Sequence, residues 1–327
     1  MTGRRHGTML ALCVLATLAA PALAQTQKRT PPPPPPAPSA AANPDNGNAD
    51  IAYGAFQRGM FLTALAEASK RAQQNDPAAM TLLGELYAQG LGVPRDDAKA
   101  ANWYKQAAAH GDRDAMFALA MFNLEGRAGP RNPDEAARLL AAAAKLGHAA
   151  AAYDLGLLYL QGQQFPQDFA RAAQLFRQAS DAGNADAQYA LAAMCKEGRG
   201  VPKDLNEAER LMGLASVAGN VDAMVEYAIA QFNGSGVAKN EVAAAKLMLI
   251  AARRGSAIAQ DRMARILMAG RGMPTDATEA VKWHIIAKAG GDSDPDLDAF
   301  AAQQTQQVRD AAEKAAKIWM STVPPRP

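Results

Sequence analysis

The sequence predicts an all-α protein, a right-handed solenoid of paired antiparallel helices with a period of 36 residues. Three observations predict this class: the chain aligns with itself without gaps at an offset of 36 over residues 77–291, four alignment columns keep one residue type, and no segment has the pattern of a strand. Self-similarity at such a period is the signature of stacked helical repeats. The glycine columns are Gly90, Gly126, Gly162, Gly198, Gly234, Gly270 and Gly111, Gly147, Gly183, Gly219, Gly255, Gly291. The alanine columns are Ala100, Ala136, Ala172, Ala208, Ala244, Ala280 and Ala107, Ala143, Ala179, Ala215, Ala251, Ala287.

Each unit is expected to contain two helices joined by a loop. The first helix ends at one glycine column, because glycine adopts the left-handed conformation at a helix C-terminus without a Cβ penalty. The loop has the form Gly-x-Gly-x-Pro, as in Gly90 to Pro94, and its proline prevents the helix from continuing. An Asp or Asn two residues after the proline column is suited to cap the second helix. These caps are Asp96, Asn132, Asp168, Asp204, Asn240 and Asp276, and capping boxes are expected with Glu135, Glu207 and Glu279.

The turn from one unit to the next is very short. The second helix ends at the other glycine column, and most of the residues that follow are N-cap types. They are Asp112, His148, Asn184, Asn220, Ser256 and Asp292. Consecutive helices must therefore be antiparallel and packed side by side. The invariant alanines let the backbones of neighbouring helices approach closely. A large residue in place of Ala172 or Ala208 is therefore expected to overpack this contact and to lower the free energy of unfolding by about 1 to 3 kcal/mol.

This pattern resembles the Sel1-like repeat, a relative of the tetratricopeptide repeat, over residues 77–292. The resemblance rests on the Leu-Gly pair of the first helix, on the Gly-x-Gly-x-Pro-x-Asp loop and on the run Trp103-Tyr104-x-x-Ala-Ala-x-x-Gly. Trp283 occupies the position of Trp103 in the last unit. The sequence departs from the pattern at Ala238, which replaces the loop proline, and at Ala128 and Gln164, which replace the second loop glycine. The resemblance implies six repeats and a scaffolding or adaptor role.

The N-terminus has the pattern of an export signal. Arg4 and Arg5 precede an apolar run over 9–20, and Ala22-Leu23-Ala24 supplies small residues for a signal peptidase. The run of about 12 residues spans only ~18 Å, short of a ~30 Å hydrocarbon core. We therefore expect a signal peptide at 1–24 cleaved after Ala24, a periplasmic location, and no integral membrane span after processing.

The segments around the repeats have distinct expected roles. Residues 25–49 are proline-rich and are expected to form a disordered linker. Because the end of a solenoid has a face without a neighbour, we expect an N-terminal capping half-repeat at 50–76, with Asn75 in the place of glycine, and a C-terminal capping helix at 293–320. The apolar stripe of that helix is Leu297, Phe300, Val308, Ala311, Ala315, Ile318 and Trp319. Residues 321–327 are expected to be a tail.

Composition excludes several classes of function. Lys and Arg number 34 against 32 Asp and Glu, and the two excess cations lie in the signal segment. The rest of the chain has no net charge, so its overall electrostatic field does not favour binding of nucleic acid. Two cysteines exclude a disulfide scaffold, and Cys195 is expected to be a packed apolar group, with a reactive thiol as the alternative.

Catalytic and metal-binding patterns are missing from the sequence. His110, His148 and His284 lie in three different units without metal-ligand spacing; His148 is in a cap column, and His284 is expected to be packed. No nucleophile, base and oxyanion donors can be assembled from the repeat columns. We therefore expect no catalytic residues, no metal, no cofactor and no enzymatic activity.

A row of equivalent positions on the first helices is the candidate partner surface, because solenoids present such rows to extended peptides. The candidate partner-binding residues are Asp154, Leu157, Gln161, Glu197, Glu226, Arg262 and Arg265. The acids and apolar groups would form the middle of a groove, and Arg262 and Arg265 a cationic end that pairs with carboxylates. The alternative is that the apolar members are core and the polar members are solvated.

We expect a monomeric, non-catalytic scaffold or regulator in the cell envelope that binds a protein or peptide partner. One alternative is a cell-wall-directed binder or hydrolase related to β-lactams or peptidoglycan, an activity proposed for cysteine-rich relatives. Another is a passive tether in which linker and solenoid act as a spacer.

Overall fold

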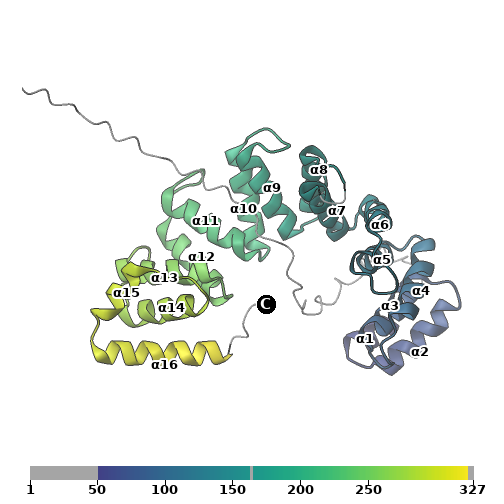
Figure 1. Cartoon of the computed structure of the whole chain (residues 1–327), viewed down its shortest axis with the longest axis horizontal. Coiled ribbons are helices and arrows are strands. Elements are labelled where there is room, and N and C mark those ends of the chain that lie inside the picture. Colours follow the sequence, from purple (N-terminus) through teal and green to yellow (C-terminus); the bar gives the residue numbers. More distant parts are fainter. Residues whose placement is uncertain (1–50, 163–164, 323–327) are drawn as a thin grey trace, which may run out of the picture. The chain divides into compact units, whose positions relative to one another are not determined.

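The computed structural model describes residues 51–162 and 165–322, and every regular element in those ranges is an α-helix (Figure 1). The predicted class, an all-α solenoid of paired helices, is confirmed. The predicted signal peptide at 1–24, the linker at 25–49 and most of the tail lie outside the described residues, as does Gln164.

Six helix pairs follow one another along the chain, and each helix in them has 13 residues. The first helices of the units are α3 (Pro77–Gln89), α5 (Arg113–Glu125), α7 (Ala149–Gln161), α9 (Ala185–Glu197), α11 (Val221–Asn233) and α13 (Ala257–Ala269). The second helices are α4 (Asp97–Ala109), α6 (Pro133–Lys145), α8 (Phe169–Asp181), α10 (Leu205–Val217), α12 (Glu241–Arg253) and α14 (Ala277–Ala289). Each second helix from α4 to α12 packs against its own first helix and against the first helix of the next unit.

The helix ends follow the repeated columns. Each first helix ends at a glycine with φ between 67° and 73°, in the left-handed region. All six Asp and Asn residues expected to cap second helices accept a hydrogen bond from the backbone N–H three residues later. Asp292 is the exception among the caps expected after the other glycine column. Asp294 caps the following helix instead, because Pro295 fits the first helical position.

The predicted capping boxes do not close. In a capping box the glutamate side chain binds the N–H of the cap residue. Here the cap N–H groups of Asn132, Asp204 and Asp276 donate to carbonyl oxygens of the preceding first helix, at 2.9, 2.9 and 3.2 Å. The three glutamates bind cationic side chains instead, as when the Glu135 carboxylate accepts hydrogen bonds from Arg138. The cap residue is thus fixed from both sides without the glutamate.

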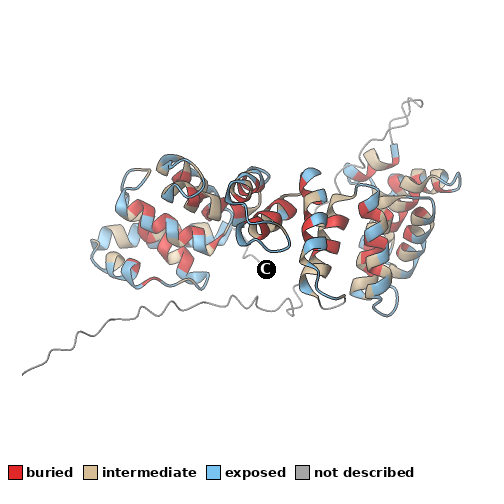
Figure 2. Ribbon diagram, turned by 90° about the horizontal axis from the view of Figure 1, so that it is seen from above, coloured by how far each residue is buried: buried red, intermediate tan, exposed pale blue. Residues whose placement is uncertain are grey.

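The two alanine columns form the seams of the solenoid. All twelve alanines are at most 2% exposed, and the buried residues line the helix faces that meet their neighbours (Figure 2). A methyl group at these contacts lets helix axes approach closely, as predicted.

Aromatic side chains on two second helices need glycine opposite them. A Cβ on Gly84 would lie 2.5 Å from the Tyr104 ring, and one on Gly156 would lie 2.7 Å from the Phe176 ring. The other units keep alanine at the glycine position and a non-aromatic residue or histidine opposite. Those pairs are Ala120 with Leu140, Ala192 with Met212, Ala228 with Met248 and Ala264 with His284. The volume of each pair is therefore balanced within its own unit.

The N-terminal end consists of α1 (Ile51–Gln57) and α2 (Phe61–Ala72), which packs on α3. Asn75 has φ 62° and is the one non-glycine residue in the left-handed region among the described residues. This matches its predicted place in the glycine column, because asparagine tolerates that conformation better than most residues.

The C-terminal end differs from the single helix expected at 293–320. It forms α15 (Pro295–Ala302) and α16 (Gln306–Thr322), separated at residues 303–305. The buried residues of α16 are Ala312 and Ala316, whereas Ala311 and Ile318 are exposed. The predicted stripe is therefore met only in part on α16, where Val308, Ala315 and Trp319 are half-buried. The Trp319 ring still packs on the Trp283 ring, with centroids 5.7 Å apart.

Candidate binding surface on the first helices

First helices of neighbouring units contact one another through their side chains. We use the name first-helix row for α5, α7, α9 and α11, residues 113–125, 149–161, 185–197 and 221–233. Between α5 and α7, the His148 Nδ1 accepts a hydrogen bond from the Ala151 N–H at 3.0 Å, so the proton of the neutral ring is on Nε2. That Nε2 lies 3.4 Å from Asp114, and the ring stacks on Phe117 at 4.5 Å. Burial and the nearby Arg113 lower the pKa of His148 to about 4, so the ring is neutral at pH 7.

The contact between α9 and α11 centres on Glu226. The Tyr189 hydroxyl donates to the Glu226 carboxylate at 2.9 Å, and Lys196 Nζ donates to its other oxygen at 3.3 Å. Beside them, the Asn220 side chain donates to Asp186 at 2.8 Å. Burial and the Glu226 carboxylate raise the pKa of Tyr189, so this phenol stays protonated.

Tyr153 occupies the same column on α7 as Phe117 on α5 and Tyr189 on α9. Burial, together with Asp186 and Asp154, raises its pKa to about 12. The row therefore presents neutral aromatic groups beside ionised carboxylates.

The predicted members of the row are surface residues of mixed exposure. Asp154 and Leu157 on α7 are half-buried, and Gln161 at its end is exposed. Leu157 also packs against buried residues of the core, as the core interpretation of the apolar positions expects, and its contact with a partner stays a prediction. Glu197 is exposed and lies 2.9 Å from Arg199, and Glu226 is half-buried in the contact with Tyr189 and Lys196.

The predicted cationic end is only partly available. Arg265 binds Asp294, which is 5% exposed, and lies 3.7 Å from Asp261 and from Asp296. Its guanidinium therefore helps to fix the start of α15, and pairing of Arg265 with a partner carboxylate stays a prediction. Within the part of the chain that the structure describes, Arg262 is exposed and has no hydrogen bond or ion pair.

The loops between first and second helices contain contacts that the sequence reasoning missed. Arg127 binds Asp97 of the preceding unit at 2.6 Å, donates to the Ala88 carbonyl at 3.1 Å and lies 4.0 Å from the Phe122 ring centroid. Asp97 is buried in part, which raises its pKa, but hydrogen bonds from Arg95 and Arg127 lower it below the ordinary value.

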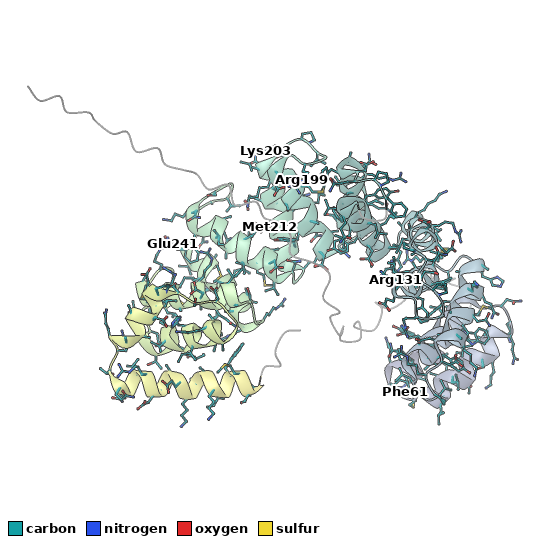
Figure 3. The ribbon with its side chains drawn as sticks, in the orientation of Figure 1. Phe61, Arg131, Arg199, Lys203, Met212 and Glu241 are labelled. Carbon is teal, nitrogen blue, oxygen red and sulfur yellow. The ribbon has the colours of Figure 1, made fainter. Side chains whose placement is uncertain are left out.

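The same arginine position recurs in every second unit. Arg271 binds Glu241 at 2.7 Å, and Arg199 lies 5.4 Å from the Phe169 ring centroid; Arg199 and Glu241 are labelled in Figure 3. A self-comparison at twice the repeat offset would have found Arg127, Arg199 and Arg271 in one column. These arginines join adjacent units, so they are structural.

The remaining candidate groups are structural as well. Cys195 is buried, as predicted, and burial raises the pKa of its thiol. His284 is buried, and its Nε2 lies 2.8 Å from Asp298 on α15. In the described residues, no three His, Cys, Asp or Glu side chains are grouped to hold a metal ion, and no helix is long and apolar enough to cross a membrane.

Tandem pairs of antiparallel helices, each packed on the next, define an α-solenoid. The sequence model of the family described as Sel1 repeat matches six times, at residues 77–112, 113–148, 149–184, 185–220, 221–256 and 257–292. The matches cover more than half of the chain, and the protein belongs to the Sel1 repeat family.

Solved structures share the fold. A Sel1 repeat protein from Oxalobacter formigenes is 27% identical, with a TM-score of 0.68, and the match covers 74% of this chain and 100% of that one. A protective antigen of uropathogenic Escherichia coli strains, described as displaying an SLR fold, is 23% identical with a TM-score of 0.52; that match covers 80% of this chain and 64% of the antigen. No curated protein matches the chain.

Proposed function

We propose that this protein is a non-catalytic scaffold or regulator of the cell envelope that binds a protein or peptide along the first-helix row. Helical-repeat solenoids commonly serve as interaction surfaces, because stacked units repeat equivalent side-chain positions in space. The observation that supports this most is that Met121, Leu157 and Ile229 occupy the same repeat position on three first helices and are half-buried, with carboxylates on the same helices. Apolar groups that stay partly accessible between charged ones are typical of a binding surface.

The proposed contact residues are Asp154, Leu157, Gln161, Glu197, Glu226, Arg262 and Arg265. The envelope location rests on the export signal expected at residues 1–24. We further propose that the protein acts as a monomer, without metal, cofactor or nucleic acid. A neutral chain whose cations and acids are nearly balanced supports the last point.

Site-specific photo-crosslinking in the cell envelope tests this proposal. Gln161 on α7 and Gln174 on α8 are both exposed glutamines, one on the row and one on a second helix. A photoreactive phenylalanine analogue at 161 is expected to crosslink one defined protein, and the same analogue at 174 is not. Equal crosslinking from both positions, or none from either, would contradict a partner bound along the row.

The hydrolase alternative is tested separately with the purified chain. Incubation with β-lactam and peptidoglycan substrates is expected to give background rates, because the repeat columns bring no nucleophile and base together. Turnover that a single side-chain replacement abolishes would establish that alternative.

A further inference from the structure

The outer sides of the second helices differ along the chain. On each second helix this side faces away from the buried alanine columns, as helical spacing requires. At the outward positions α4, α6 and α8 carry no valine, leucine or isoleucine, and the acids Asp134 and Asp181 occur there. The same positions of α10 and α12 carry no acid and are occupied by Asn206, Arg210, Gly213, Leu214, Val217 and by Val242, Lys246, Leu249, Ile250, Arg253.

Several of these apolar side chains are exposed, and exposed cations lie among them. Val217 is 89% exposed, and Leu214 and Ile250 are 44% and 45% exposed. Apolar side chains that gather on a surface mark a site of interaction. We use the name outer patch for Leu214, Val217, Val242, Lys246, Ile250 and Arg253, all of which are exposed.

Contacts between units place the two halves of the outer patch side by side. Arg254, at the end of α12, donates to a carbonyl in the turn after α10 at 2.9 Å. In the third unit the column of Ile250 is occupied by Gln178, whose amide donates to the Ala144 carbonyl on the preceding second helix. Ile250 therefore extends from α12 toward the end of α10, where Val217 lies.

The cations of the outer patch are not paired with acids of the chain. Lys246 and Arg253 make no hydrogen bond or ion pair within residues 51–162 and 165–322, and Arg254 beside them binds a backbone carbonyl. A carbonyl oxygen orients a guanidinium without cancelling its charge, so this end of α12 stays positive.

The acids of α10 and α12 are engaged elsewhere. Glu207 and Glu241 are each bound by two cations, none of them in the outer patch. Glu209 is half-buried and lies near Lys196 and Glu226 of the first helices. The outer patch therefore combines exposed apolar groups with positive charge that the described residues do not neutralise.

The last unit has a helical cover over the same column. Ile286, one repeat after Ile250, is 3% exposed and is buried in one cluster with Leu297 of α15 and Ala316 of α16. Both of these helices pack on α14. In the described part of the chain no helix covers Leu214 or Ile250 in this way, and both stay exposed. A helix with an apolar face is therefore the element that fits the outer patch.

We infer that the outer patch binds a partner protein through an amphipathic helix whose apolar face is flanked by aspartate and glutamate. The apolar face covers Leu214, Val217 and Ile250, and the carboxylates pair with Lys246 and Arg253. This surface is on second helices, so the inference goes beyond the proposed function of the first-helix row and does not depend on it.

Other occupants fit this surface less well. Two copies of the chain joined face to face at their outer patches would bring like cations together, which costs binding energy. An anionic membrane would attract the cations, but the patch has no tryptophan or phenylalanine to insert into the lipid interface. A helix that carries the acids satisfies both the apolar and the cationic side chains.

Fluorescence anisotropy with the full chain tests the inference. The probes are labelled helix-forming peptides of equal length, each with a leucine-rich face flanked by glutamate, by lysine or by glutamine. The glutamate peptide is expected to bind at least about tenfold more tightly than the lysine peptide at low salt, with a difference that shrinks as salt rises. Equal binding of these two peptides, tighter binding of the lysine peptide, or no binding of the glutamate peptide would overturn the inference.

A variant taken from other units tests the apolar part of the patch. Leu214→Gln with Ile250→Gln introduces the residue that the first and third units carry in this column, at Gln106 and Gln178, so the repeat tolerates it. This variant is expected to weaken the glutamate peptide on the order of tenfold, with an unchanged circular dichroism spectrum. Unchanged binding would show that the peptide is held elsewhere and would overturn the inference.

A matched pair of variants tests the charge. Lys246→Gln with Arg253→Gln removes two cations from the patch, and Lys105→Gln with Lys145→Gln removes two exposed cations from α4 and α6. The first variant is expected to weaken the glutamate peptide about fivefold at low salt, and the second about twofold or less. Equal weakening would show a general charge effect and overturn the inference.

Co-sedimentation with lipid vesicles tests the membrane alternative. Vesicles of phosphatidylglycerol and phosphatidylcholine are expected to leave the full chain in the supernatant. Sedimentation of the parent chain, but not of the Leu214→Gln, Ile250→Gln variant, would assign the outer patch to an anionic membrane and overturn the inference.

Discussion

At the scale of single residues, the repeats tolerate aromatic groups only where the facing residue is small. Gly156 faces the Phe176 ring, whereas the preceding unit pairs Ala120 with Leu140. Gly156→Ala is expected to destabilise the protein by about 1 to 2 kcal/mol, because overpacking outweighs the helix propensity gained by alanine. The same change in a Phe176→Leu background is expected to be neutral or stabilising.

Urea unfolding of the four proteins in this double-mutant cycle measures the coupling between positions 156 and 176. Additive effects of the two changes would contradict the volume balance, because independent sites do not compensate each other.

The His148 cap makes stability depend on pH. Its pKa is about 4 in the folded chain against 6.5 in the unfolded chain, so the unfolded state binds protons first as pH falls. The stabilisation is complete above pH 6.5 and is lost between pH 6.5 and 4. We expect a loss of about 2 kcal/mol from this group between pH 7 and 5.

The matched variant is His148→Asn, which retains the type of cap found at Asn184 and Asn220 without a titrating group. Denaturant unfolding at pH 7 and pH 5 is expected to show a smaller decrease for the variant than for the parent chain. The same decrease in both proteins would mean that His148 does not titrate as its contacts require.

At the scale of elements, the loop arginines of alternate units, Arg127, Arg199 and Arg271, contact the preceding unit. Arg127 contacts Asp97, the Ala88 carbonyl and the Phe122 ring, so Arg127→Ala removes two hydrogen-bonded partners and a cation–π contact. We expect a loss of about 1 to 2 kcal/mol and faster amide exchange in α3 to α6. Lys145→Ala, which removes an exposed cation at the end of α6, is the control and is expected to change stability by less than about 0.5 kcal/mol. Comparable effects of the two changes would show that Arg127 does not join the units.

The sequence predicted most of the element structure because glycine, proline and cap residues act locally. The period, the helix pairs, eleven of the twelve expected caps and the left-handed Asn75 follow from one or two adjacent residues. What the sequence did not predict is which of several nearby groups binds a given donor or charged side chain. Glu135 binds Arg138, since the cap N–H it was expected to bind already has a carbonyl partner. The pairing of Arg265 with Asp294 was not predicted, because α15 begins at Pro295, beyond the repeats.

The candidate surface was predicted less completely than the fold. Helical spacing placed Asp154, Leu157 and Gln161 on one first helix, which is where they lie. Spacing does not show whether an acid is bound by an arginine or by an amide, and that difference separates Glu207 from Asp186. The partner of each acid follows only from how the side chains of neighbouring units pack in three dimensions.

At the scale of the whole molecule, the solenoid is stabilised by contacts between adjacent units, and we propose that the first-helix row binds the partner. The seams between helices consist of buried alanines, loop arginines bind the preceding unit, and Glu135, Glu207 and Glu241 of the second helices pair with in-chain arginines. Because units contact mainly their neighbours, a partner laid along the row contacts several units at once and is expected to protect them together.

Amide hydrogen exchange of the full chain, alone and in complex with the protein that crosslinks to position 161, tests the central claim most directly. The account predicts added protection in α5, α7, α9 and α11, with little change in α6, α8, α10 and α12. Protection confined to the second helices, or to α15 and α16 at the C-terminal end, would show that the first-helix row is not the binding surface.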